Sequence, residues 1–140
     1  MLVIETEYGA VEVELYPKDA PKTVARISEL AQKKFYDGLT FHRVVPNFVV
    51  QGGDPVGNGT GGSGQNLPAE FNSKRHIEGT VAMARASDPN SADSQFYICL
   101  EKLPSLDGNY TVFGQVTKGM DAVKKIKVGD KMKKVYLKKD

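Results

Sequence analysis

Short runs of alternating apolar and polar residues dominate the chain and predict β-strands. Residues 2–6 and 11–16 are rich in β-branched side chains and flank a Tyr8-Gly9 turn, which is typical of a hairpin. The second run alternates valines with acidic residues, so one of its sides faces water. Further strand candidates cover residues 81–84, 95–100 and 111–116.

Two segments have the periodicity of helices instead. Between Pro21 and about Lys34, apolar residues recur every three or four positions. Proline suits the first turn of a helix, so either Asp19 or Ala20 would be the capping residue. A second, short helix is expected over Met120–Ile126. Many strands with only two helices favour an antiparallel barrel or sandwich over a wound parallel sheet.

The length of 140 residues suits one domain, which we assign to residues 1–140. No apolar run reaches the roughly 18 residues of a membrane span, and the N-terminus has no basic flank of a secretory signal, so we expect a cytoplasmic protein that does not enter a membrane. The single Cys99 excludes an intrachain disulfide. With His42 and His76 as the only histidines, we expect no metal site.

The net charge of +2 is unevenly distributed. Residues 118–140 hold 9 lysines and 3 aspartates, whereas residues 1–117 hold 10 basic and 14 acidic residues. A basic tail could contact nucleic acid. Because these lysines are interleaved with apolar residues, we favour a solvated edge strand and expect no nucleic-acid partner.

A glycine-rich segment, Gly57–Gly62, matches the dinucleotide fingerprint G-x-G-x-x-G. The fingerprint requires a helix after its last glycine, and residues 63–68 are a poor helix start. The segment is better interpreted as a loop with positive φ angles, or one that a ligand approaches closely. We therefore expect no nucleotide cofactor.

The candidate chemistry lies between Phe41 and Asp54. In a single strand, Arg43 and Gln51 would share one face and Phe48 would lie on the other. Pro46 favours an edge, a bulge or a bend, which would change the alternation and bring the three side chains together. An arginine beside an aromatic wall is a candidate site, although the spacing alone favours a surface ion pair of Arg43 and an ordinary core Phe48.

The segment Phe41–Asp54 as a whole resembles the signature of the cyclophilin family of peptidyl-prolyl isomerases. The similarity extends over nearly the whole chain, through Ala20–Thr23, Phe41–Asp54, Gly59–Gly62, Met83-Ala84, Ser94–Phe96, Leu106–Gly108 and Val112–Gly114. It implies a mainly β fold, a closed eight-stranded antiparallel β-barrel capped by two α-helices, with a proline pocket on its outer surface.

The resemblance also implies roles for individual residues. Arg43 corresponds to the catalytic arginine, with Gln51 as its orienting partner and Phe48 as part of the apolar clamp. The other positions implied to contact the peptide or the proline ring are Val49, Gly59, Ala84, Arg85, Ala86, Gln95, Tyr97, Leu106 and Tyr110.

This chain departs from the best-known eukaryotic pattern at several of these positions. Valine replaces methionine at Val49, arginine replaces asparagine at Arg85, tyrosine replaces phenylalanine at Tyr97, and tyrosine replaces histidine at Tyr110. Ser105 stands where those members have tryptophan. Because the indole offers a large apolar surface and a hydrogen-bond donor, its absence predicts weak cyclosporin binding.

Two functions follow from the resemblance. The first is an isomerase, acting as a monomer without metal or cofactor on proline-containing peptides and unfolded proteins during folding. The second is a proline-peptide binding module or chaperone with incidental catalysis. Arg43, Gln51 and Phe48 together favour the enzyme, since a binding module needs the pocket but no oriented donor.

Overall fold

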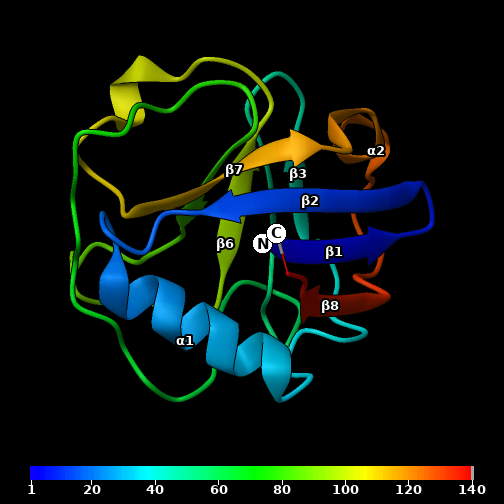
Figure 1. The fold of residues 1–140 in the computed structure, drawn as a ribbon, viewed down its shortest axis with the longest axis horizontal. Coiled ribbons are helices and arrows are strands. Elements are labelled where there is room, and N and C mark those ends of the chain that lie inside the picture. Colours follow the sequence, from blue (N-terminus) through cyan, green and yellow to red (C-terminus); the bar gives the residue numbers. More distant parts are fainter. Residues whose placement is uncertain (140) are drawn as a thin grey trace.

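The computed structural model describes residues 1–139 and consists of one β-sheet with two α-helices packed against it (Figure 1). In chain order the strands are β1 Leu2–Thr6, β2 Gly9–Leu15, β3 Arg43–Val45, β4 Val49–Gly52, β5 Thr80–Met83, β6 Phe96–Cys99, β7 Val112–Lys118 and β8 Lys134–Leu137. The α-helices are α1 Pro21–Gln32 and α2 Met120–Lys125, and a 3-10 helix, η1, covers Pro104–Leu106.

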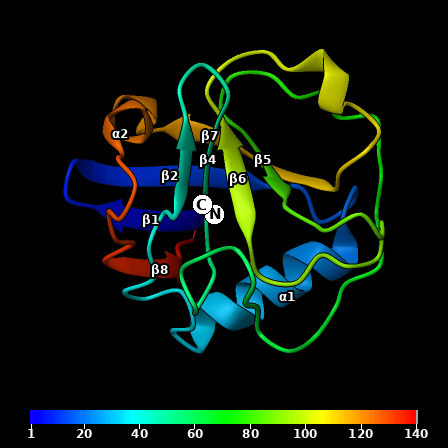
Figure 2. The same cartoon turned by 180° about the vertical axis from the view of Figure 1, so that it is seen from behind.

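The strands form one eight-stranded sheet in the order β3-β4-β6-β5-β7-β2-β1-β8, and all neighbouring pairs are antiparallel. The predicted mainly β class is therefore confirmed. A closed barrel, however, overstates the architecture, because β3 and β8 lie at opposite ends of this order. The sheet is curled into a half-barrel, as Figures 1 and 2 show from opposite sides.

Irregular backbone crosses the gap between the two edge strands. Thr40, before β3, forms an isolated antiparallel bridge with Lys131, before β8. Next to it, the Phe41 N–H donates to the Asp130 carbonyl at 2.8 Å. Gly129, with a φ of 94°, turns the chain just before this contact, and such a conformation interrupts a regular strand. The two edges are thus connected through residues 40–41 and 129–131, without an eighth strand pair between β3 and β8 in the described residues.

Helix α1 begins with Pro21 after the N-cap residue Ala20, whose side chain cannot accept a hydrogen bond. Glu70, in the long connection between β4 and β5, supplies the missing acceptor. Its carboxylate accepts from the Lys22 N–H at 3.1 Å and from the Thr23 N–H at 2.8 Å. A negative charge at this end is also favourable to the helix dipole. The loop and the helix therefore hold each other in place.

The main hydrophobic core lies on the inner face of the sheet, where both helices cover it. Helix α1 contributes Val24, Ile27 and Leu30, and α2 contributes Ala122 and Val123. Each fully buried large apolar side chain stabilises the fold by about 1.5–3 kcal/mol relative to its exposed form. Because the helices occupy this face, the opposite face of the central strands remains available for a site.

The segment from Arg43 to Gln51 is a hairpin and not the single strand considered from the sequence. Strands β3 and β4 pair with Val45 opposite Val49, and the Phe48 N–H donates to the Val45 carbonyl at 3.1 Å. Asn47 has a φ of 60° and follows Pro46, which is the arrangement of a type II turn. The hairpin places Arg43 directly opposite Gln51.

The lysine-rich C-terminal segment contains β8, which pairs with β1 and lies at one end of the sheet. The interpretation of this segment as an edge strand is confirmed. Lys134 is exposed, whereas Val135 packs into the main core. Among residues 1–139, no helix has the length and apolar character that a membrane span requires.

Candidate functional site

The outer face of the central strands carries a second hydrophobic cluster. In β6, Phe96 and Ile98 pack into the main core. The alternate residues, Tyr97 and Cys99, pack into the second cluster together with Val49. This division follows from the two-residue period of a strand, which sends successive side chains to opposite faces. The second cluster is the apolar base of a surface site.

A pocket opens above this cluster. It encloses about 360 Å³, within the range of roughly 300–1,000 Å³ that is usual for small-ligand sites. The buried Tyr97 and Val49 form its base, and the half-buried Phe48, Leu106 and Tyr110 rise around them. Its lining consists of Arg43, Phe48, Val49, Gln51, Ala84, Arg85, Tyr97, Leu106 and Tyr110.

Sheet register brings the polar side chains to the rim of this pocket. Arg43 pairs with Gln51 across β3 and β4, and Gln51 pairs with Tyr97 across β4 and β6. Cross-strand partners share a face, so the three side chains lie in one row. Phe48 joins them from the end of the hairpin turn, and the Arg43 guanidinium carbon lies 5.8 Å from the centre of its ring.

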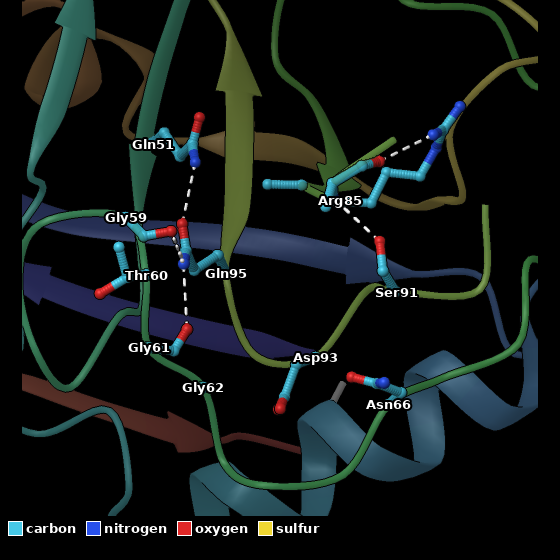
Figure 3. Close-up of a pocket in the computed structure, with 12 residues that line it drawn as sticks. Gln51, Gly59, Thr60, Gly61, Gly62, Asn66, Arg85, Ser91, Asp93 and Gln95 are labelled. Atoms are coloured by element: carbon cyan, nitrogen blue, oxygen red, sulfur yellow. Dashed lines mark hydrogen bonds between the residues drawn. The ribbon is translucent and has the colours of Figure 1, made fainter. Parts of the chain in front are cut away.

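A chain of amide hydrogen bonds holds the arginine. Gln95 Nε2 donates to the Gly59 and Gly61 carbonyls, at 3.0 Å each, while Gln95 Oε1 accepts from Gln51 Nε2 at 3.0 Å (Figure 3). Gln51 Oε1 then accepts from Arg43 Nη1 at 3.2 Å. Because the glycine carbonyls can only accept, they fix the orientation of Gln95 and hence that of Gln51.

The glycine-rich loop that supplies these carbonyls is held by Asp54. Its carboxylate accepts hydrogen bonds from the backbone N–H groups of Val56, Asn58 and Gly59. Burial alone would raise the pKa of Asp54, but these N–H donors outweigh it and hold the pKa below its usual range. The positive φ angles of Gly57 and Gly59 agree with the loop interpretation of this segment.

A second, more polar hollow of about 300 Å³ adjoins the pocket and shares Gln51, Ala84 and Arg85 with it (Figure 3). Together the two hollows include all twelve predicted site residues. Gly59, Ala86 and Gln95 belong to the second hollow alone. Lining residues that were not among these twelve are Asn66, Ser91 and Asp93, together with Thr60, Gly61 and Gly62 of the glycine-rich segment that the sequence indicated as a loop approached by a ligand.

Arg85 is oriented away from Gln51 and Gln95 (Figure 3). Its guanidinium donates to the Asn109 carbonyl through Nε and Nη2, at 3.0 and 2.8 Å, and lies 4.8 Å from the ring centre of Tyr110. The side chain therefore ties the Ala84–Ala86 segment to the loop that carries Tyr110. This geometry gives Arg85 a structural role in the wall that the two hollows share.

His76 was missed as part of the site. It is completely buried, and its Nε2 lies 2.8 Å from the hydroxyl of Tyr97 at the base of the pocket. No local pattern indicates this contact, since the two residues are 21 positions apart. The tyrosine that replaces phenylalanine at Tyr97 is the one signal, because a buried hydroxyl requires a partner.

An open apolar pocket beside a braced, exposed arginine, adjoined by a more polar hollow, defines a β protein with a candidate ligand-binding site on the outer face of its sheet. The family model described as cyclophilin type peptidyl-prolyl cis-trans isomerase matches residues 1–140. The chain therefore belongs to the cyclophilin-type peptidyl-prolyl cis-trans isomerases, enzymes that bind proline-containing peptides.

Named relatives and solved structures agree with this assignment. A peptidyl-prolyl cis-trans isomerase of Synechococcus elongatus is 45% identical over 137 residues, covering 96% of this chain and 94% of the relative. Peptidyl-prolyl cis-trans isomerase B of Bacillus subtilis is 50% identical, covering 89% of this chain and 88% of the relative. The crystal structure of a Cryptosporidium parvum cyclophilin in the presence of the dipeptide Ala-Pro has a TM-score of 0.92 at 28% identity, covering 99% of both chains.

Proposed function

We propose that Arg43 accelerates rotation of the X-Pro bond by donating a hydrogen bond to the prolyl nitrogen. The planar amide resists rotation by about 18–20 kcal/mol because the nitrogen lone pair is conjugated with the carbonyl. In the twisted transition state this conjugation is lost, so the nitrogen becomes a better acceptor. A donor placed there binds the twisted form more strongly than the planar one, which is the requirement for catalysis.

The row formed by Arg43, Gln51 and Tyr97 across β3, β4 and β6 is the observation that carries this proposal. Gln51 accepts a hydrogen bond from one guanidinium nitrogen of Arg43. The remaining N–H donors of this planar, forked group stay at the pocket rim. The base and walls provided by Tyr97, Phe48 and Leu106 would hold the proline ring beneath it. Residues preceding the proline would lie in the hollow lined by Gly59, Ala86 and Gln95.

The energy required is modest. Uncatalysed isomerisation takes tens to hundreds of seconds, so a turnover of about 1–1000 per second needs a barrier reduction of roughly 3–7 kcal/mol. A hydrogen bond to a charged donor contributes about 1.5–3 kcal/mol. The apolar clamp and the groove contacts would supply the remainder. The mechanism uses no covalent intermediate.

The test compares wild type, Arg43→Ala and Arg43→Lys by NMR exchange spectroscopy of a proline peptide, with peptide affinity measured in parallel. We expect Arg43→Ala to lose about 100-fold in kcat/KM, as is usual on removal of one preorganised donor, with little change in peptide Kd. Arg43→Lys keeps the charge but lacks the forked guanidinium, so its kcat/KM should lie between those of wild type and Arg43→Ala. Wild type that binds the peptide without accelerating exchange would instead indicate a binding module.

Weak cyclosporin binding is a further part of this proposal. Ser105 lies exposed in η1, next to the wall residue Leu106. A hydroxymethyl group offers little of the apolar surface that an indole presents at the rim. Isothermal titration should show that Ser105→Trp binds cyclosporin more tightly than wild type, with kcat/KM for a short peptide unchanged. Equal affinities of the two proteins would contradict the inference.

A further inference from the structure

His76 connects the base of the pocket to the loop that carries its wall. Its backbone N–H donates to Asp107 Oδ1 at 2.6 Å, and its ring Nδ1 lies 3.0 Å from the same oxygen. Its carbonyl accepts from the Leu103 N–H at 2.9 Å, and Nε2 contacts the Tyr97 hydroxyl at 2.8 Å. All of these bonds form around a side chain that is fully buried.

The partners determine the tautomer of this ring. Burial lowers the pKa of His76, so the ring is neutral and has one donor and one acceptor. The His76 backbone N–H lowers the pKa of Asp107, which is therefore a charged acceptor. Nδ1 must carry the proton, and Nε2 must accept from the Tyr97 hydroxyl. Burial raises the pKa of Tyr97, which keeps that hydroxyl protonated.

The hydrogen bonds of His76 reach both sides of the short helix that carries the wall residue Leu106. Leu103 and Asp107 flank η1, whose last residue is Leu106, so His76 holds both ends of this short element. Its ring also stacks on Tyr97, with 5.9 Å between centroids and 17° between planes, and meets Tyr110 edge-on at 6.3 Å. Three residues that line the pocket are thus positioned from one buried group.

We propose that His76 is a positioning residue for the isomerase reaction: it sets the spacing between Tyr97 at the base and Leu106 and Tyr110 at the wall, which grip the proline ring. This inference rests on the proposed function of the pocket. It requires no contact between His76 and the substrate. A loosened grip should weaken binding of the planar and the twisted peptide alike, so the effect lies mainly in KM and peptide Kd.

The test uses Tyr97→Phe, which removes one hydroxyl, and His76→Asn, whose amide can still donate to Asp107 but cannot reach Tyr97. Both variants are expected to raise peptide Kd and lower kcat/KM about 3- to 10-fold, the range for loss of one buried hydrogen bond. Tyr8→Phe is the matched control. It removes a hydroxyl that donates to Asp130 at 2.8 Å beside the main core, and its kcat/KM should equal that of wild type.

A double-variant cycle separates positioning from mere stability. If His76 acts through Tyr97, the double variant His76→Asn/Tyr97→Phe should have the same kcat/KM as the less active of the two single variants. Variants that are less stable but have wild-type kcat/KM and Kd would overturn the proposal, as would losses that multiply in the double variant. Should His76→Asn not fold, Tyr97→Phe decides alone. The proposed function fails separately, when Arg43→Ala is as active as wild type.

Discussion

Substitution of Gln51 by methionine tests whether the amide chain contributes to catalysis through Arg43. The Gln51 side chain accepts from Arg43 Nη1 at 3.2 Å and donates to Gln95 Oε1 at 3.0 Å. Methionine has a similar length and fills the same space without either polar group. The substitution therefore removes both hydrogen bonds while the apolar pocket remains.

The magnitude follows from the geometry of the Arg43–Gln51 bond. Hydrogen bonds to charged groups are worth about 1.5–3 kcal/mol and neutral ones about 0.5–1.5 kcal/mol. Arg43 is exposed and the bond is long, so we take about 1 kcal/mol, near the middle of the neutral range. This corresponds to about a fivefold loss of kcat/KM, far less than that expected for Arg43→Ala. The Kd of the peptide should change little, because its apolar contacts are retained.

The assay is NMR exchange of a proline peptide under saturating and subsaturating conditions, with Gln51→Glu as a second variant. A glutamate at this position would face Gln95 Oε1 with another acceptor. Reversing Gln95 would break its bonds to the Gly59 and Gly61 carbonyls. We therefore expect Gln51→Glu to weaken peptide binding more than Gln51→Met. Wild-type kcat/KM in Gln51→Met would refute the role of the chain, and a loss equal to that of Arg43→Ala would refute the estimate.

Other substitutions test the segments that support the site. Asn47→Ala should lower the free energy of unfolding by about 1 kcal/mol because alanine tolerates a positive φ poorly, whereas Asn47→Gly should be neutral within a few tenths, as urea denaturation can show. Gly61→Ala should cost about 1–3 kcal/mol in the same assay, because its Cβ would lie 2.7 Å from Val56 Cγ2 and closer still to Asp54. Burial raises the pKa of the Cys99 thiol to about 12, so a thiol reagent at pH 8 should label it in denaturant but not in the native protein.

Elements set by local pattern could be predicted from the sequence. The helix from Pro21 was predicted to about Lys34 and ends at Gln32, and the strand predicted over residues 95–100 covers Phe96–Cys99. The apolar period and the position of a proline are sufficient for such elements. Their exact ends depend on long-range contacts, such as the carboxylate of Glu70 at the start of α1.

The hairpin that contains Arg43 differs from the sequence prediction. Pro46 was interpreted as a disturbance of one strand, whereas Pro46-Asn47 is a turn signal in its own right, since Asn adopts positive φ more readily than most residues. The proximity of Phe48 to Arg43 could nevertheless be predicted. Either a bulge or a turn brings Phe48 beside Arg43, but only the turn pairs Arg43 directly with Gln51.

The open seam of the barrel and the contacts of His76 could not be predicted. Closure depends on whether β3 and β8 meet, and Gly129 makes the connecting segment irregular. His76 lies just before β5, and it reaches Tyr97 only because β6 pairs with β5. A single sequence contains no pairing information of this kind.

The same histidine should make the stability of the fold depend on pH below neutrality. Burial lowers the pKa of His76 below its ordinary value of 6.5. Its stabilising contribution is therefore complete above about pH 6.5 and is lost as the pH falls toward the folded-state pKa, because the unfolded chain binds the proton first.

Protonation would also disrupt the contact to Tyr97. A charged ring donates from both nitrogens, so Nε2 could no longer accept, and the buried Tyr97 hydroxyl would lose its acceptor. Urea denaturation from pH 7.5 to pH 5 should show wild type losing stability faster than His76→Asn, while His42 titrates alike in both proteins and cancels. Parallel pH profiles for the two proteins would mean that His76 binds its proton equally in the folded and unfolded chains, which its burial argues against.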